Sequence, residues 1–188
     1  MHKYLPKVFI FLDHYNNQIF KIKKLNIGII YRNYKDHNRE NQLIKIANAC
    51  KQNRYQLFVS NDLKLALKVK ANGIYIPSFN KTKKFFNLEK KILIIGSAHN
   101  QKEIKIKISQ NCSAIFLSPL FNVEKSNKYL DLHKFNYLTY INKIKVLALG
   151  GISEINIRKL KLLSIEGFGG ISMFKKKPAL KKAGFYKF

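Results

Sequence analysis

The stretch KVLALGGISEINIRKL, Lys145 to Leu160, combines an apolar run, a pair of glycines and a helical pattern. The run from Val146 to Leu149 is typical of a short buried strand. Gly150 and Gly151 let the backbone turn through angles that other residues resist. Ser153 then stands where a helix N-cap is expected. A strand, a glycine turn and a helix start together predict a place where backbone N–H groups hold an anion.

The same alternation of apolar runs and helical patterns continues along the chain and predicts a parallel sheet, because parallel neighbours need crossover connections. About eight strand–helix units predict a compact (β/α)₈ TIM barrel, with a doubly wound open sheet as the alternative. A chain of 188 residues is short for that barrel, so the first and last helices are expected to be shortened. The predicted strands cover 8–13, 27–32, 56–60, 73–77, 92–97, 114–118, 145–150 and 168–174, and the predicted helices cover 40–53, 61–71, 101–110, 131–141 and 154–164, with a weaker one over 80–90.

Length and composition predict one globular domain over residues 1–188, with a hydrophobic share of 46% that supports a core. The two cysteines, Cys50 and Cys112, stand in no metal-binding spacing and favour a reducing, cytoplasmic setting. No apolar run approaches the roughly 18 residues of a transmembrane helix, so no membrane span is expected.

The formal net charge of +26 raises the question of nucleic-acid binding. Only four of the 36 basic residues are arginine, however, and the lysines are spread along the chain. Nucleic-acid recognition favours arginine for bidentate contacts. We therefore interpret the charge as a compositional bias that also attracts small anions, and keep a nucleic-acid-binding protein as a distant alternative.

In a (β/α)₈ barrel, the functional residues lie at the carboxyl ends of the strands. Gly150 and Gly151 follow the seventh predicted strand, and Gly169 and Gly170 belong to the eighth. Turns after these two strands often bind phosphate, so a phosphate on a small substrate is the anion we expect there.

Several of the strand-end segments resemble, in order, motifs of the thiamine phosphate synthase and TenI family. SNDLKLALKVKANGIYIP resembles ND…LA…GADGVHLG, and IIGSAHNQKEI resembles GVSAHT…E. SAIFLSPLF resembles DYIGLGPVF, LALGGISEIN resembles IGGI…N, and EGFGGISMF resembles GADGVSMI, while IIYRNY stands where the family has QLREK. The resemblance runs from about Ile27 to Phe174, and it implies a (β/α)₈ barrel.

The resemblance also implies an activity: condensation of a hydroxymethylpyrimidine diphosphate with a thiazole phosphate, which gives thiamine phosphate and pyrophosphate. It implies Mg²⁺ as the cofactor and phosphorylated pyrimidine and thiazole molecules as the partners. Both a metal ion and cationic side chains can neutralise the charge that develops on a leaving pyrophosphate.

The family's functional positions carry over to particular residues of this chain. By resemblance, Arg32, Asn61 and Ser97 contact the pyrophosphate, and Asp62 is a magnesium ligand. Asp62 is equally well placed to N-cap the following helix. The resemblance further assigns the thiazole phosphate to Gly150, Gly151 and the backbone near Ser172, and Gly170 and His99 are further candidate substrate contacts.

Three departures from the family pattern affect the implied chemistry. Asn80 stands at the second magnesium aspartate, where its carbonyl oxygen can ligate but brings no charge. Tyr34 replaces a lysine of the family pattern. The threonines of the family's PTxTK loop are also lost, and Lys125 or Lys128 could replace the lysine of that loop.

Two further members of the same family remain as alternatives. A TenI-type tautomerase needs a histidine in the sixth-strand loop, where Ser118 stands here. A non-catalytic binder of thiazole phosphate would keep the phosphate cradle without the chemistry.

Overall fold

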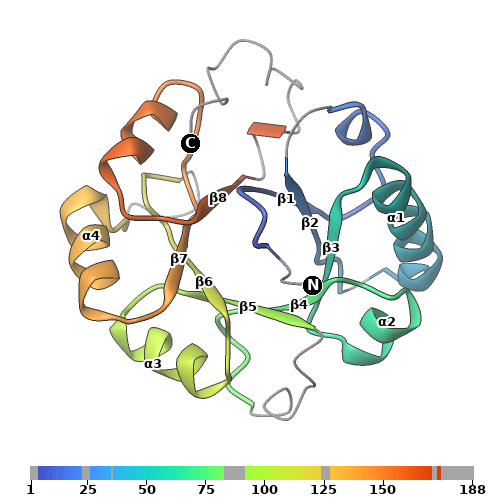
Figure 1. Cartoon of the computed structure of the whole chain (residues 1–188), viewed down its shortest axis with the longest axis horizontal. Coiled ribbons are helices and arrows are strands. Elements are labelled where there is room, and N and C mark those ends of the chain that lie inside the picture. Colours follow the sequence, from blue (N-terminus) through green and yellow to red (C-terminus); the bar gives the residue numbers. More distant parts are fainter. Residues whose placement is uncertain are drawn as a thin grey trace.

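The computed structural model describes residues 4–22, 26–34, 36–82, 92–123, 128–170 and 173–174. Within them, eight parallel strands close into a barrel in chain order, and the last strand pairs with the first (Figure 1). This confirms the (β/α)₈ barrel and excludes the open sheet. The strands are β1 (Val8–Leu12), β2 (Ile27–Tyr31), β3 (Gln56–Ser60), β4 (Gly73–Ile76), β5 (Leu93–Ala98), β6 (Ala114–Leu117), β7 (Lys145–Ala148) and β8 (Gly167–Gly170).

The barrel interior is filled by aromatic side chains that alternate with outward-facing residues along the strands. Phe116 packs edge-on against Phe9, with ring centroids 5.1 Å apart, and against Phe11 at 5.4 Å. Gly28 and Gly73 leave room for the interior rings of Phe9 and Phe58, because a Cβ added at either glycine would lie 2.6 Å from the ring of Phe9 or Phe58 respectively. The barrel is therefore a packed core, and ligands are confined to its rim.

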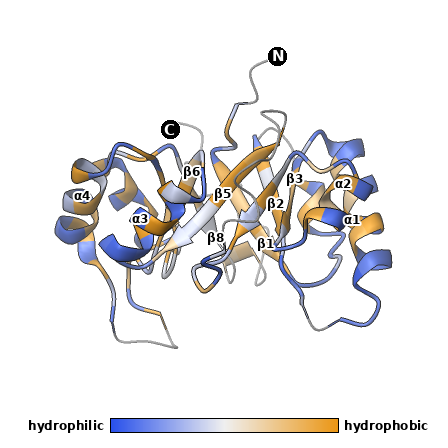
Figure 2. Cartoon of the chain, turned by 90° about the horizontal axis from the view of Figure 1, so that it is seen from below, coloured by the Kyte–Doolittle hydropathy of each residue, from blue (hydrophilic) through white to orange (hydrophobic). Residues whose placement is uncertain are grey.

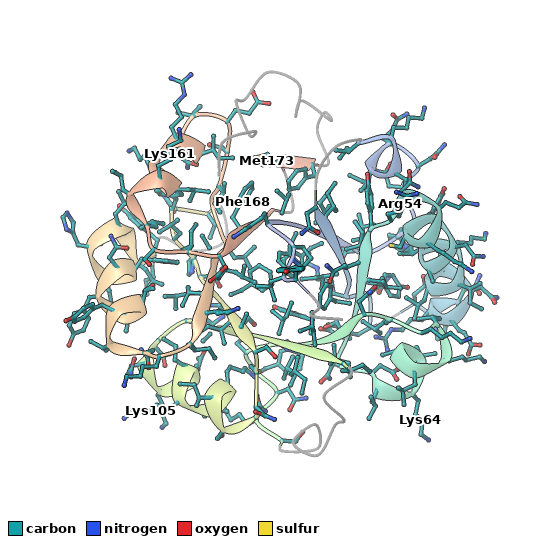
Figure 3. All side chains as sticks on the ribbon, in the orientation of Figure 1. Arg54, Lys64, Lys105, Lys161, Phe168 and Met173 are labelled. Carbon is teal, nitrogen blue, oxygen red and sulfur yellow. The ribbon has the colours of Figure 1, made fainter. Side chains whose placement is uncertain are left out.

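The helices surround the barrel, and their hydrophilic residues face outward while hydrophobic residues concentrate on the strands (Figures 1 and 2). Lys64, Lys105 and Lys161 project from the periphery, away from the barrel axis (Figure 3). No described helix is long and apolar enough to cross a membrane. The helices are α1 (Arg39–Asn53), α2 (Leu63–Lys68), α3 (Gln101–Ser109) and α4 (Asp131–Ile141), with 3₁₀ helices η1 (Ile19–Lys21) and η2 (Ile157–Leu162).

Some connections agree with the sequence prediction and others differ from it. In the described part of the first crossover, the helix is the single turn η1, as expected for a shortened first helix. The helix predicted over 154–164 is the shorter 3₁₀ helix η2, and its N-cap is Asn156 instead of Ser153. The eighth strand, predicted over 168–174, is described over Gly167–Gly170, and residues 173–174 are helical, so the prediction was too long. The weaker helix predicted over 80–90 falls largely outside the described residues, and so does the predicted last helix.

Candidate functional site

A cavity of about 670 Å³ opens at the carboxyl ends of β6, β7 and β8. It contains the predicted phosphate-binding glycines of both turns and the predicted substrate contact His99. The structure therefore brings together residues that the sequence placed at separate strand ends. The lining comprises His99, Ser118, Pro119, Val123, Lys128, Tyr129, Leu130, Lys134, Leu149, Gly150, Gly151, Ile152, Gly169 and Gly170.

The glycine pair after β7 is required by the loop after β6. Gly150 and Gly151 have φ angles of +92° and +68°, which L side chains rarely adopt. A Cβ on Gly150 would lie 2.7 Å from the Cα of Pro119, and one on Gly151 would lie 2.5 Å from the carbonyl oxygen of Asn122. The two loops are also joined by a hydrogen bond from the Phe121 N–H to the Gly150 carbonyl at 3.1 Å. The glycines thus let two loops of the cavity wall touch.

Asn156 holds this turn in place, and the sequence reasoning did not single it out. Its side-chain Nδ2 donates to the Gly151 carbonyl at 2.7 Å, and its Oδ1 accepts from the Ser153 N–H at 2.9 Å. The sequence feature that could have identified Asn156 is its position three residues after Ser153, because asparagine at this spacing can hydrogen-bond to the nearby backbone. Because η2 begins only at Ile157, the anion site predicted at a helix start rests on the glycine turn alone.

His99 connects three turns at the rim. Its Nδ1 lies 2.7 Å from the carbonyl oxygen of Ser118 and 3.3 Å from that residue's Oγ, and its Nε2 lies 3.2 Å from Oγ of Ser78. The imidazole therefore ties the loop after β4 to the one after β6, and it also lines the cavity. The hydrogen bonds of His99 therefore hold the loops after β4 and β6 in place beside the cavity.

Arg32 lies on the other half of the rim, after β2, beside the end of β1. Leu12 and Tyr31 are register partners, so Asp13 and Arg32 follow side by side. The Arg32 Nε donates to Asp13 Oδ1 at 2.9 Å, and its guanidinium carbon lies 5.6 Å from the Phe11 ring centroid. About a third of the Arg32 side chain is exposed. The guanidinium is thus held in orientation while part of it faces solvent.

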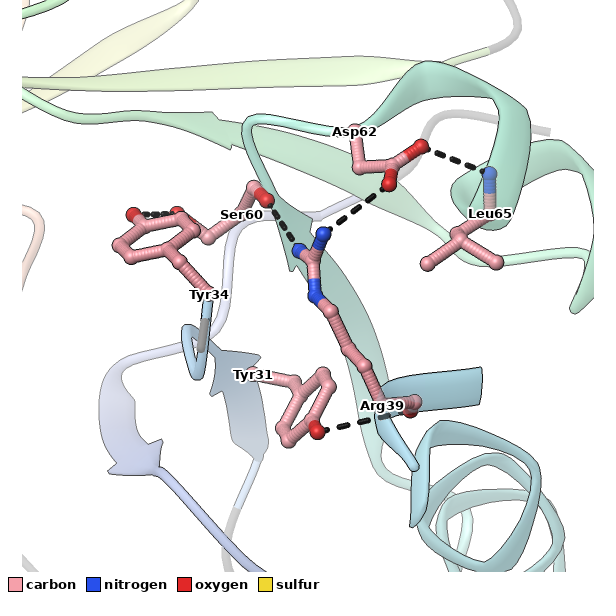
Figure 4. Close-up of polar contacts among 6 residues, drawn as sticks. All are labelled: Tyr31, Tyr34, Arg39, Ser60, Asp62 and Leu65. Carbon is pink, nitrogen blue, oxygen red and sulfur yellow. Dashed lines mark hydrogen bonds and ion pairs between the residues drawn. The ribbon is translucent and has the colours of Figure 1, made fainter. Parts of the chain in front are cut away.

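Arg39, at the start of α1, is a rim residue that the sequence analysis did not select. Its Nη1 donates to Asp62 Oδ2 at 3.0 Å, and its Nη2 donates to the Ser60 carbonyl at 2.8 Å (Figure 4). The same guanidinium lies 5.7 Å from the Tyr34 ring. Burial raises the pKa of Tyr34, so its hydroxyl stays protonated, in hydrogen-bond contact with Ser60 Oγ. Arg39 thereby joins the loops after β2 and β3.

Asp62 caps α2, as one of the two sequence interpretations expected. Its Oδ1 accepts the Leu65 N–H at 3.0 Å while its Oδ2 accepts from Arg39 (Figure 4). Neighbouring Asn61 has a left-handed backbone with φ of +57°. The Asn61 Oδ1 accepts a hydrogen bond from Asn80 Nδ2, which joins the turns after β3 and β4.

The Asn80 turn is supported from behind by a buried lysine. Lys107 of α3 is fully buried, and its Nζ lies 2.8 Å from the Pro77 carbonyl and 2.7 Å from the Asn80 carbonyl. Gln110 Oε1 accepts from the same Nζ at 2.9 Å. Burial lowers the pKa of Lys107 to about 8.

Ser97 lies at the end of β5 and faces the barrel interior. Only 4% of it is exposed, and it is hydrogen-bonded to the side chain of Tyr75. Burial raises the pKa of that tyrosine to about 12, so the phenol remains neutral. The assignment of Ser97 to pyrophosphate stays a prediction. Lys125 and Ser172, the two remaining predicted site residues, lie outside the described residues.

The described residues do not fit a magnesium ion at the place where the sequence analysis expected one. The two Asp62 oxygens accept hydrogen bonds from Arg39 and from a backbone amide, and the Asn80 Oδ1 accepts from the N–H of Thr82 at 2.8 Å. Among the residues that the structure describes, no three His, Cys, Asp or Glu side chains converge as a metal site. Asp62 and Asn80 are therefore built into the loops as structural groups.

Comparisons with known proteins identify the family. A family model, TMP-TENI, described as thiamine monophosphate synthase, matches residues 22–174. The chain belongs to this family. A thiamine-phosphate synthase of Prochlorococcus marinus subsp. pastoris is 32% identical over 162 residues, which are 79% of this chain and 45% of that protein. The thiamine-phosphate synthase of Hydrogenobaculum sp. is 25% identical over 149 residues, covering 76% of this chain and 68% of that protein.

Solved structures support the fold of this thiamine monophosphate synthase family member. A thiamine phosphate pyrophosphorylase from Pyrococcus furiosus superposes with a TM-score of 0.72 at 16% identity, over 94% of this chain and 91% of that one. The chain spans about half the length of the Prochlorococcus relatives it matches.

Proposed function

We propose that this family member condenses a hydroxymethylpyrimidine diphosphate with a thiazole phosphate to give thiamine phosphate and pyrophosphate. The observation that supports it is the cavity at the carboxyl ends of β6, β7 and β8, lined by both glycine-bearing turns. Turns in this place bind phosphate in many barrels. The cavity lies in the size range of small-molecule sites.

The cavity suits a thiazole phosphate. Gly150 and Gly151 carry no side chain that could block a phosphate from their backbone N–H groups, and Gly170 lines the same cavity. The apolar side chains of Leu130 and Ile152 line the same cavity and suit the thiazole ring. Lysines on its border, Lys128 and Lys134, favour an anionic ligand.

The pyrimidine diphosphate is assigned to the rim over β2, β3 and β4, where Arg32 stands. In the proposed step, the bond between the pyrimidine methylene carbon and the diphosphate oxygen breaks, and its electron pair leaves with the oxygen. The thiazole nitrogen then donates its lone pair to the methylene carbon. Arg32 stabilises the departing diphosphate, because a guanidinium matches phosphate oxygens in bidentate geometry.

The test mixes the purified protein with both substrates and measures thiamine phosphate after oxidation to its fluorescent product, in Mg²⁺ and separately in EDTA. Product formation above the substrate-only control supports the synthase. If the folded protein makes no product in either buffer, the synthase proposal is wrong.

A non-catalytic binder of thiazole phosphate is the second candidate, and the hydrogen-bonded pair Asn61 and Asn80 favours it, since these neutral amides supply no charge for catalysis. It predicts a rise in unfolding temperature with thiazole phosphate without turnover. A reducing, cytoplasmic setting belongs to both proposals. It is supported by Cys50 and Cys112, which are free thiols whose burial raises the pKa of each to about 12.

A further inference from the structure

Two asparagines face each other where the loops after β3 and β4 meet. Asn80 Nδ2 donates to Asn61 Oδ1, and Asn80 Oδ1 accepts from both the N–H and the Oγ1 of Thr82, at 2.8 Å and 3.0 Å. The amide oxygens are thus already acceptors within the protein. A divalent cation at this point would also meet the NH₂ group of Asn80, which is a donor and repels a cation.

Asp62, the carboxylate that follows Asn61 in the chain, already has partners for both of its oxygens. Its side chain is 28% exposed and that of Arg39 is 17% exposed. Turning Asp62 toward a metal would break its bond to Arg39 and leave a largely buried guanidinium beside a dication. Such an uncompensated charge is costly.

Fixed positive charge lies behind the same loop. The buried Lys107 Nζ contacts the Asn80 carbonyl at 2.7 Å, and Arg39 pairs with Asp62, the residue after Asn61. Mg²⁺ prefers sites with carboxylate oxygens and retains several waters. A neutral amide pair whose adjoining backbone and carboxylate groups contact a lysine and an arginine respectively offers the opposite environment.

We propose that this edge of the barrel binds diphosphate without a divalent cation, and that the Asn61–Asn80 pair occupies the place of the metal. The inference rests on the proposed function, which brings a diphosphate to this rim. Arg32 supplies the charge: its Nε is bonded to Asp13, and neither Nη atom hydrogen-bonds to another residue in the part of the chain that the structure describes.

Direct metal binding tests the proposal apart from activity. We would titrate Mn²⁺ into the wild-type protein and into the double variant Asn61→Asp with Asn80→Asp, and follow free Mn²⁺ by electron paramagnetic resonance. The two new carboxylates replace the amides with little change of shape, so we expect the double variant to bind at least about tenfold more tightly than wild type. The matched control is Asn48→Asp with Asn111→Asp, since both side chains are exposed and Asn111 shares the left-handed backbone with φ of +61°.

Pyrophosphate binding supplies the second readout. The unfolding temperature of the wild type should rise equally with pyrophosphate in EDTA and in Mg²⁺. Three outcomes would each overturn the inference. The first is a rise in unfolding temperature with pyrophosphate that requires Mg²⁺. The others are equal Mn²⁺ affinity in the wild type and the double variant, and a control variant that gains as much Mn²⁺ binding as the double variant. Thiazole phosphate is measured in parallel. If thiazole phosphate raises the unfolding temperature and pyrophosphate does so only with Mg²⁺, this inference alone is wrong. If neither ligand raises the unfolding temperature, the proposed function is wrong too.

Discussion

Arg39 and Asp62 join the start of α1 to the cap of α2: Nη1 lies 3.0 Å from Oδ2, while Oδ1 of the same carboxylate accepts the Leu65 N–H. One carboxylate therefore caps a helix and pairs with a guanidinium at once. The loops after β2 and β3 are held together by this contact.

Removing one member of this pair should destabilise the protein. We expect Arg39→Met to lower the free energy of unfolding by about 1–3 kcal/mol, because Asp62 and the Ser60 carbonyl lose their donors. Asp62→Asn keeps a capping oxygen but removes the charge. Urea unfolding of both single variants and the double variant gives the coupling energy.

The exposed ion pair of Lys68 and Glu40 is the matched control for this double-mutant cycle, because both of its side chains are about half exposed. Its coupling should stay below about 1 kcal/mol. Equal coupling in the two pairs would show that the Arg39–Asp62 contact has no special role.

Arg32→Ala should weaken pyrophosphate binding by about tenfold or more, because charge-assisted hydrogen bonds to the diphosphate are lost. Arg32→Lys should restore only part of the affinity, since an ammonium lacks the bidentate geometry. The exposed Arg158→Ala is the control for net charge, and calorimetric titration is the measurement. Similar losses in Arg32→Ala and Arg158→Ala would mean that overall charge alone attracts the ligand.

Gly151→Ala should destabilise the protein by about 2 kcal/mol or more, because its φ of +68° and the Asn122 carbonyl 2.5 Å from an added Cβ both oppose a side chain. The unfolding-temperature rise with thiazole phosphate should disappear. Asn156→Ala is the milder companion, with a loss of about 1 kcal/mol from two local hydrogen bonds. Wild-type stability of Gly151→Ala would contradict the loop contact seen here.

Lys107 should make stability depend on pH above neutrality. Burial lowers its pKa from 10.5 to about 8, and electrostatic interactions with Cys112 and Glu103 oppose the shift. Between these values the unfolded chain binds the proton and the folded chain does not, so the contribution of Lys107 to the free energy of unfolding rises with pH. Urea unfolding from pH 7 to pH 10 should therefore show a steeper upward slope for wild type than for Lys107→Met. Parallel slopes would place the Lys107 pKa near its ordinary value in the folded protein.

The barrel could be predicted because each strand carries its own evidence. Runs such as Val146–Leu149 are apolar along their length, and strands buried on both faces require that composition. The helix expected over 154–164 was too long, because Asn156 bonds back to Gly151 and Ser153 and delays the helix to Ile157. The spacing of apolar residues predicts a helix but gives no information on these competing hydrogen bonds.

The site was predicted in part. The glycine turns and His99 line one cavity, as strand ends of a closed barrel must lie close together. Arg39 was missed because its partner Asp62 is 23 positions away, and no local pattern links the two. The Asn61–Asn80 pair likewise spans 19 positions.

The order of strands and helices, the barrel and the family can be read from the sequence alone, because apolar periodicity, glycine turns and ordered motifs are local properties of the chain. The partners of the rim side chains are set only when the chain folds. Asp62 binds Arg39 and a helix amide, and Asn61 binds Asn80, because closure of the barrel brings together loops whose charges and hydrogen-bonding groups must then satisfy one another.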